Sequence, residues 1–340
     1  MVKKNSLVIG FLLVALLVGA IIGLSASKIF DRPITIVCAF SAGGGTDLVD
    51  RALAEGMKEY LGVQVNVVNM VGGLGGVATD YVWNKPRDGY HILGISETGL
   101  FLPANGGHHT TTKDWEYFMA GGSPGAVMVA ADSPYKTFGD LLAACRAKPG
   151  QIKVAASVMG GLWSTKWAAI CKTAGIKTNI LGYNGSAPSI TAAMAGEVDV
   201  VHVSAGEALS YLQAKKLRAL CMSELEPFEI PGVGKVPAIV DWLPELKKIL
   251  PMPQWLGLAV PADTPRPILN EITQAFKYAM NTKAVEEVLK SQLAVKYGYY
   301  GPKAKAVAQD LESKFCWLLW ELGMAKRNPA ELGIPKPEEM

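Results

Sequence analysis

The residues best suited to chemistry lie in one glycine-rich segment, Phe40 to Asp47, which reads FSAGGGTD. Three consecutive glycines let the backbone turn tightly and leave N–H groups uncovered by side chains. Thr46 is a good helix-capping residue, and Asp47 suits a first helical turn. Because free N–H groups at a helix N-terminus attract anions, the segment predicts a site for a carboxylate or phosphate. A strand-to-helix turn without a ligand has the same pattern, and the segment alone leaves both readings open.

Patterns typical of enzymes are incomplete in this sequence. Ser96 lies in Gly-x-Ser-x-x-Gly, one residue longer than the nucleophile elbow of α/β hydrolases. The glycines of the first segment are not followed by the lysine of a phosphate-binding P-loop. His108 and His109 are adjacent, a spacing that suits joint metal ligation poorly, and no HExxH motif is present. We therefore expect a binding protein with no metal and no cofactor rather than an enzyme.

The elements around the glycine segment alternate between strand and helix. Residues 34–40 form an apolar, β-branched run typical of a buried strand. Val49, Leu53 and Met57 follow at a spacing of four, which predicts one apolar face of a helix. The order strand, glycine loop, helix recurs near residues 153–174, and a further strand at 198–203 ends near Ser204 and Glu207. Alternation of this kind predicts an α/β fold with mostly parallel sheets and ligands at the carboxyl ends of the strands.

The alternation breaks near Ala130 and resumes near Trp255. We therefore expect two lobes, one formed by residues 31–130 with 254–340 and the other by residues 131–253, each a sheet flanked by helices. The glycine and serine loops of both lobes would line the cleft between them. These loops carry almost no lysine or arginine, so a bound carboxylate would be held by N–H groups, hydroxyls and water.

The first 27 residues have the pattern of a targeting segment. Lys3 and Lys4 precede an apolar run from Leu7 to Leu24, and small residues follow at Ser25 and Ser27. The run is long for a signal peptide and just long enough to span a bilayer, so residues 1–27 are either a cleaved signal peptide or an N-terminal membrane anchor. In both cases the remaining chain is expected to be periplasmic or otherwise extracytoplasmic.

Composition argues against nucleic-acid partners and leaves one possible disulfide undecided. The net charge is +3, two of the lysines lie in the targeting segment, and no basic run indicates nucleic-acid binding. Half of the residues are hydrophobic, as in a globular chain. The five cysteines are widely spaced, and whether Cys145 and Cys171 form a disulfide stays open.

Eight short motifs, in this order along the chain, resemble the Bug/TctC solute receptors of tripartite tricarboxylate transporters. They are FSAGGGTD with Arg51, NMVGGLGG (69–76), DGY (88–90), SPYKT (133–137), YNGSAP (183–188), GEVD (196–199), LRAL (217–220) and AVPADTP (259–265). The resemblance covers residues 33 to about 311. It implies a periplasmic-binding-protein (Venus flytrap) fold, two lobes that close on a small ligand.

The resemblance implies ligand contacts from the loops at 42–47 and 183–187 and, less securely, at 157–164. Trp163 could face the cleft or pack in the core, and Ser96, Ser204 and Glu207 lie where strands end at the expected cleft edge. The candidate ligand-binding residues are Ala42, Gly43, Gly44, Gly45, Thr46, Asp47, Ser96, Ser157, Gly160, Gly161, Trp163, Ser164, Tyr183, Asn184, Gly185, Ser186, Ala187, Ser204 and Glu207.

The function implied is that of a monomeric extracytoplasmic receptor. It would bind a small organic acid and deliver it to the membrane permease subunits of a tripartite tricarboxylate transporter. A sensory or adaptor relative that uses the same cleft for signalling is an alternative, and an exported enzyme is a weaker one because the catalytic groups are missing.

Overall fold

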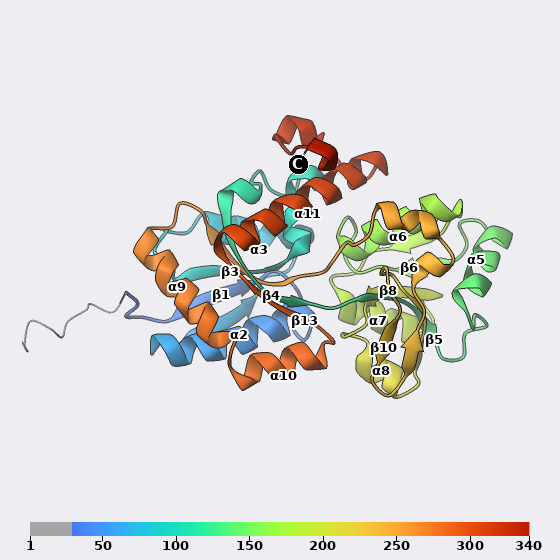
Figure 1. Cartoon of the computed structure of the whole chain (residues 1–340), viewed down its shortest axis with the longest axis horizontal. Helices are drawn as coiled ribbons and strands as arrows, with labels where there is room; N and C mark the ends of the chain where they lie inside the picture. The colour runs from blue at the N-terminus through green and yellow to red at the C-terminus, as the bar shows by residue number, and fades with distance from the viewer. Residues whose placement is uncertain (1–28, 340) are drawn as a thin grey trace, which may run out of the picture.

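The computed structural model describes residues 29–339. Within them two β-sheets with their helices form two lobes side by side (Figure 1). The expected signal peptide or anchor, residues 1–27, lies outside the described residues. Between residues 29 and 339 the structure contains no helix with the length and apolar character needed to cross a membrane.

The first lobe is built on a six-stranded sheet in the order β13-β4-β12-β3-β1-β2. Its strands are β1 (Ile34–Cys38), β2 (Val65–Asn69), β3 (His91–Ser96), β4 (Trp115–Gly122), β12 (Leu256–Pro261) and β13 (Val295–Tyr299). β1 pairs in parallel with β2 and β3, whereas β12 pairs antiparallel with β3 and β4. This sheet therefore combines strands from both ends of the chain.

The second lobe is built on a five-stranded sheet in the order β7-β6-β8-β5-β9. Its strands are β5 (Gly125–Ala130), β6 (Lys153–Ala155), β7 (Asn179–Leu181), β8 (Val200–Ser204) and β9 (Leu217–Met222). β6 pairs in parallel with β7 and β8, and β5 pairs antiparallel with β8 and β9. A two-stranded hairpin, β10 (Phe228–Ile230) with β11 (Gly234–Val236), completes this lobe.

Helices cover the two sheets. The first lobe carries α2 (Gly45–Leu61), α3 (Gly76–Trp83), α4 (Leu102–Asn105), α9 (Arg266–Ala279), α10 (Lys283–Ser291) and α11 (Gly301–Glu321), and the second α5 (Phe138–Ala147), α6 (Leu162–Ala174), α7 (Ser186–Met194) and α8 (Leu209–Gln213). Short 3-10 turns are η1 (Gly73–Gly75), η2 (Glu97–Phe101), η3 (Thr112–Asp114), η4 (Ile239–Asp241), η5 (Pro244–Lys248), η6 (Pro329–Leu332) and η7 (Pro337–Glu339). α11 packs on β4 and also contacts α6 of the other lobe (Figure 1).

The two-lobed α/β fold is confirmed, with two differences in detail. Both sheets are mixed rather than mostly parallel, because strands that cross between lobes, such as β5 and β12, enter antiparallel to their neighbours. In addition, β5 belongs to the second sheet, so the first crossing lies between Gly122 and Gly125 and not near Ala130. The turn residues between β4 and β5, Ser123 and Pro124, resemble those of a loop within one lobe, so the sequence pattern does not mark the crossing.

α2 positions the glycine segment. Its predicted apolar face is buried, with Val49, Leu53 and Met57 all essentially inaccessible to solvent. Gly56 lets α2 approach α9 closely, because a Cβ there would lie 2.6 Å from the Cα of Ala279. The buried face thus fixes the helix, and with it the N-terminal end that points toward the other lobe.

The two segments that join the lobes lie side by side. The backbone N–H of Ser123, on the first crossing, donates to the side-chain oxygen of Gln254 on the return crossing, at 3.1 Å. A Cβ at Gly122 would overlap the carbonyl of Gln254, so only glycine permits this approach. Adjacent crossing segments of this kind are where a two-lobed protein bends.

Candidate functional site

The first glycine loop joins β1 to α2 and presents the N-terminus of that helix. Gly44 caps the helix without a side-chain hydrogen bond, so the N–H groups of the helix start are open to partners from outside the loop. Gly43 has a φ of +79°, which a residue with a side chain adopts rarely. The loop therefore needs its glycine to turn, and the turn directs the helix start at the cleft.

Asp47 holds this loop in place. Its carboxylate accepts hydrogen bonds from the Gly43 N–H at 2.9 Å, from Arg51 Nε at 3.0 Å and from Asn69 Nδ2 at 2.8 Å. Burial alone would raise the pKa of Asp47, but the bonds from Arg51, Gly43 and Asn69 outweigh it and lower that pKa. Both carboxylate oxygens are engaged within the protein, so Asp47 acts as a brace for the loop.

The second lobe contributes two further helix starts. α6 begins after Gly161 and α7 after Gly185, and neither cap makes a side-chain hydrogen bond. Ser157, in the loop before α6, has a φ of +56°, which is uncommon for a residue other than glycine, and its N–H donates to Ser189 Oγ at 3.2 Å. Strained backbone of this kind is often found where a loop contacts a ligand.

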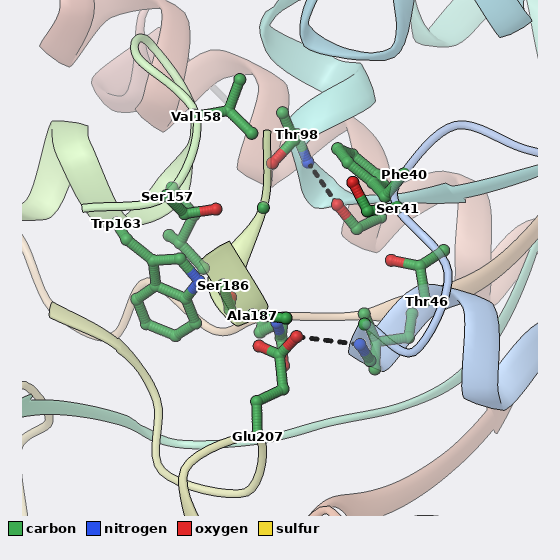
Figure 2. Close-up of a pocket in the computed structure, with 18 of the residues that line it drawn as sticks. Phe40, Ser41, Thr46, Thr98, Ser157, Val158, Trp163, Ser186, Ala187 and Glu207 are labelled. Carbon is green, nitrogen blue, oxygen red and sulfur yellow. Dashed lines mark hydrogen bonds between the residues drawn. The ribbon is translucent and has the colours of Figure 1, made fainter. Parts of the chain in front are cut away.

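The three helix starts meet at one cavity between the lobes, seen in Figure 2. Counted together with the open solvent at its mouth, the space between the cavity walls is about 520 Å³. Its walls are Phe40, Ser41, Gly44, Gly45, Thr46, Ser96, Glu97, Thr98, Ser157, Val158, Gly161, Leu162, Trp163, Gly185, Ser186, Ala187, Pro188, Glu207, Gln254 and Leu256. Its polar side chains are six hydroxyls, two carboxyl groups and one amide, and no lysine or arginine lines it.

Glu207 reaches across the cleft from the second lobe. Its Oε1 accepts the N–H of Gly45, the first residue of α2, at 2.8 Å (Figure 2). Its Oε2 is buried and has no hydrogen-bond partner among the described residues. Burial raises the pKa of Glu207, and the Gly45 N–H, together with the nearby Ser186 hydroxyl, reduces that effect. A carboxylate therefore already occupies the helix N-terminus that the sequence marks as an anion site.

Glu97 is the second carboxyl group of the cavity. It is buried, and its oxygens accept the N–H of Trp255 at 3.0 Å and the hydroxyl of Thr98 at 3.2 Å. Burial is the main cause that raises the pKa of Glu97 to about 8, and the charge of Glu207 adds to it. Glu97 therefore carries a proton at neutral pH.

Trp163 forms an apolar wall of the cavity and also belongs to the core. Its ring lies edge-on to His202, with 5.6 Å between the ring centroids, and a Cβ at Gly125 would overlap it. His202 is fully buried behind it, and burial lowers the pKa of His202 to about 3, so this imidazole is neutral. Trp163 therefore both packs in the core and faces the cavity, because its indole is large enough to do each with a different side.

Comparison with known proteins decides the family. The model of the tripartite tricarboxylate transporter family receptor, TctC, matches residues 49–316. The chain belongs to this family.

Relatives of this TctC-family receptor agree with that assignment. It is 30% identical over 284 residues to the UPF0065 protein of the tcbD-tcbE intergenic region of Pseudomonas sp. (strain P51). The aligned residues make up 81% of this chain and 82% of the relative. The structure of the periplasmic binding protein BugD superposes with a TM-score of 0.79 at 22% identity, over 88% of this chain and 100% of BugD. MatC of Rhodopseudomonas palustris, solved with bound malate, gives a TM-score of 0.76 at 20% identity, over 85% and 99% of the two chains.

The structure brings many of the predicted site residues to the cavity. Those that line it are Gly44, Gly45, Thr46, Ser96, Ser157, Gly161, Trp163, Gly185, Ser186, Ala187 and Glu207. They come from both lobes and from five separate segments of the chain. The residues predicted from the resemblance therefore lie together around one cavity. Their contact with a ligand stays a prediction.

The other predicted residues lie beside the cavity and do not form its walls: Ala42, Gly43, Asp47, Gly160, Ser164, Tyr183, Asn184 and Ser204. Several hold the loops together. The Asn184 carbonyl accepts the Ser41 hydroxyl at 2.8 Å across the cleft, and the Ser164 hydroxyl donates to the Val158 carbonyl at 3.0 Å. These contacts shape the loops, so we expect these residues to influence binding mainly through the loops.

Sequence reasoning did not name nine wall residues: Phe40, Ser41, Glu97, Thr98, Val158, Leu162, Pro188, Gln254 and Leu256. One signal could have found Glu97, which follows Ser96 directly at the carboxyl end of β3, where ligands of parallel sheets bind. Gln254 and Leu256 come from the return crossing, which is distant in sequence, so no local pattern marks them.

The adjacent histidines and the cysteine pair that the sequence singled out lie outside this cavity. His108 and His109 stack on each other near Trp83, and across residues 29–339 no group of three or more His, Cys, Asp or Glu is placed to hold a metal ion. Cys145 and Cys171 are both free thiols in the structure.

Proposed function

We propose that this receptor captures a small organic carboxylate in the cleft between its lobes and delivers it to a membrane permease of a tripartite tricarboxylate transporter. One observation carries the proposal. The starts of α2, α6 and α7 converge from two lobes on a single cavity, and an N–H of α2 holds the carboxylate of Glu207 at 2.8 Å. Helix N-termini with free N–H groups hold carboxylates by hydrogen bonds and by the helix dipole.

Other features support binding rather than catalysis. The cavity walls contain no histidine, cysteine or lysine, and the two glutamates in the walls already accept the backbone N–H groups of Gly45 and Trp255. The structural neighbour MatC was solved with malate, an organic carboxylate of the proposed class. Within the family, receptors of this type work outside the cytoplasmic membrane, so we propose that the chain is exported before it meets its ligand.

Three interlobe contacts support closure of the cleft on a ligand. The Gly45 N–H donates to Glu207 and the Ser41 hydroxyl to the Asn184 carbonyl. The Asn105 amide donates to the Gly160 carbonyl at 3.1 Å. We propose that the lobes move about the paired crossings near Gly122 and Gln254. A permease would then recognise the closed form.

A thermal-shift screen of the chain from Lys28 onward against organic acids tests the proposal. A ligand at one hundred times its dissociation constant adds about 2.7 kcal/mol to the free energy of unfolding, which raises the melting temperature visibly. Thr46→Val and Ser186→Ala each remove one wall hydroxyl and should weaken binding roughly tenfold. Ser210→Ala, on an exposed residue of α8, is the matched control. A folded protein that no acid stabilises would refute the proposal.

A further inference from the structure

The cavity has an unusual charge balance for a site that receives acids. Two carboxyl groups, Glu97 and Glu207, line it, and no lysine or arginine does. The two groups are close enough for the charge of Glu207 to raise the pKa of Glu97. A ligand with two carboxylates would bring two negative charges beside the Glu207 carboxylate and the protonated Glu97, with no lysine or arginine in the walls to offset them, and like charges in a partly desolvated site repel.

Glu207 lacks a counter-ion. Its Oε1 takes the N–H of Gly45, but its buried Oε2 has no partner among residues 29–339. A buried charged group without a partner is unfavourable, and an ammonium group is the natural partner of a carboxylate. In Figure 2 the Glu207 carboxylate points into the cavity, between the wall formed by Trp163 and Ser186 and the start of α2 beside Thr46.

Donors for a ligand carboxylate remain on the other walls. The hydroxyls of Thr46 and Ser157 face the cavity, and the start of α6 after Gly161 adds free N–H groups. The cavity therefore presents an acceptor on one side and donors on the other. A small molecule with one carboxylate and one ammonium group matches both.

We propose that Glu207 makes this receptor selective for small amino carboxylates, whose ammonium group pairs with Glu207 while the ligand carboxylate takes the hydroxyl and N–H donors. The proposal rests on the function proposed above and narrows its ligand class. Dicarboxylates and tricarboxylates of the same length are the ligands that Glu207 excludes.

Isothermal titration calorimetry at pH 7.4 with three matched ligand classes tests the selectivity. The amino carboxylates are alanine, 3-aminopropanoate and 4-aminobutanoate, the monocarboxylates are propanoate and butanoate, and the dicarboxylates are succinate and glutarate. The wild-type protein should bind its best amino carboxylate at least tenfold more tightly than any dicarboxylate.

The variant Glu207→Gln is the decisive change. Its amide oxygen can still accept the Gly45 N–H, so the fold is preserved, and the melting temperature of the unliganded variant checks this. The variant should bind amino carboxylates at least tenfold more weakly and dicarboxylates more tightly than the wild type. Glu197→Gln, an exposed residue of the same lobe, should change neither.

Two further outcomes distinguish a failure of the proposed selectivity from a failure of the proposed receptor function. Tight binding of succinate or glutarate to the wild type, with a ranking that Glu207→Gln leaves unchanged, overturns the selectivity and leaves a carboxylate receptor. A folded protein that binds none of the seven probes overturns the selectivity, and only a negative result with the whole organic-acid screen overturns the receptor function.

Discussion

At the scale of single residues, the cavity is defined by two carboxyl groups in different surroundings. Glu207 is held at a helix N-terminus by one hydrogen bond, whereas Glu97 is enclosed and accepts two. Burial raises the pKa of both groups, and it raises that of Glu97 to about 8. Residue identity alone does not separate them, because the difference comes from the groups around each side chain.

The pKa of Glu97 predicts a pH dependence of stability. Since the folded-state pKa of about 8 lies above the ordinary value of 4.5, the folded protein holds a proton that the unfolded chain releases between these values. The contribution of Glu97 is therefore complete below about pH 4.5 and is lost as the pH rises to about 8, with a slope of up to about 1.4 kcal/mol per pH unit.

Glu97→Gln should remove this part of the pH dependence. Glutamine can accept the Trp255 N–H and donate to the Thr98 hydroxyl, as a protonated glutamate does. Urea unfolding at pH 5, 6, 7 and 8 should show the wild type losing stability relative to the variant as the pH rises. Glu226→Gln, on an exposed residue, should follow the wild type, and an equally steep curve for Glu97→Gln would contradict the assignment.

At the scale of elements, the site depends on three loops, each of which connects a strand to the helix that follows it. In each, glycine supplies the turn and the helix supplies the N–H groups. The β1–α2 loop has an additional brace, because Asp47 links the loop, the helix and β2 through Gly43, Arg51 and Asn69. The brace holds the end of α2 against Glu207 of the other lobe.

Asp47→Ala should loosen this loop. The Gly43 N–H and the Asn69 amide lose a charged acceptor, which we expect to cost about 1–3 kcal/mol of stability and to weaken ligand binding at least tenfold. Urea unfolding and calorimetry measure the two effects. Glu55→Ala, on the exposed face of the same helix, is the control and should change neither by more than about 0.5 kcal/mol. Unchanged affinity in Asp47→Ala would show that the brace does not position the site.

At the scale of the whole molecule, the cavity exists only because two lobes meet. Gly206, next to Glu207, lies against the backbone of Gln292 in the first lobe, and a Cβ on Gly206 would overlap the Gln292 carbonyl. The contact joins the loop after β8 to the end of α10. It is therefore a point where closure of the lobes can be blocked without changing a wall residue.

Gly206→Ala should hold the cleft open. The added methyl group pushes the lobes apart, so we expect ligand affinity to fall at least tenfold while the melting temperature of the unliganded protein changes little. Small-angle X-ray scattering should give a larger radius of gyration than for the wild type. Gly139→Ala, in the same lobe with no atom nearer than 3.4 Å to the new methyl group, is the matched control. Wild-type affinity in Gly206→Ala would argue against closure at this contact.

Sequence by itself determined the local elements and the type of site. The run at 34–40, the glycines at 43–45 and the apolar spacing after them predicted β1, its loop and α2, because hydrophobic period and turn chemistry are properties of neighbouring residues. The same reasoning placed Glu207 at the cleft edge. The order of the motifs then indicated the family, which the comparison confirms.

The tertiary structure alone decided which residues share the cavity and in what state. β5 joins the second sheet, Gln254 returns beside Gly122, and Glu97 becomes enclosed by Trp255, a residue far along the chain. Asp47 likewise points into the protein, because Arg51 and Asn69 donate hydrogen bonds to its carboxylate. Burial and charge depend on contacts between segments distant in sequence, so no local pattern could assign a proton to Glu97 or an unpaired oxygen to Glu207.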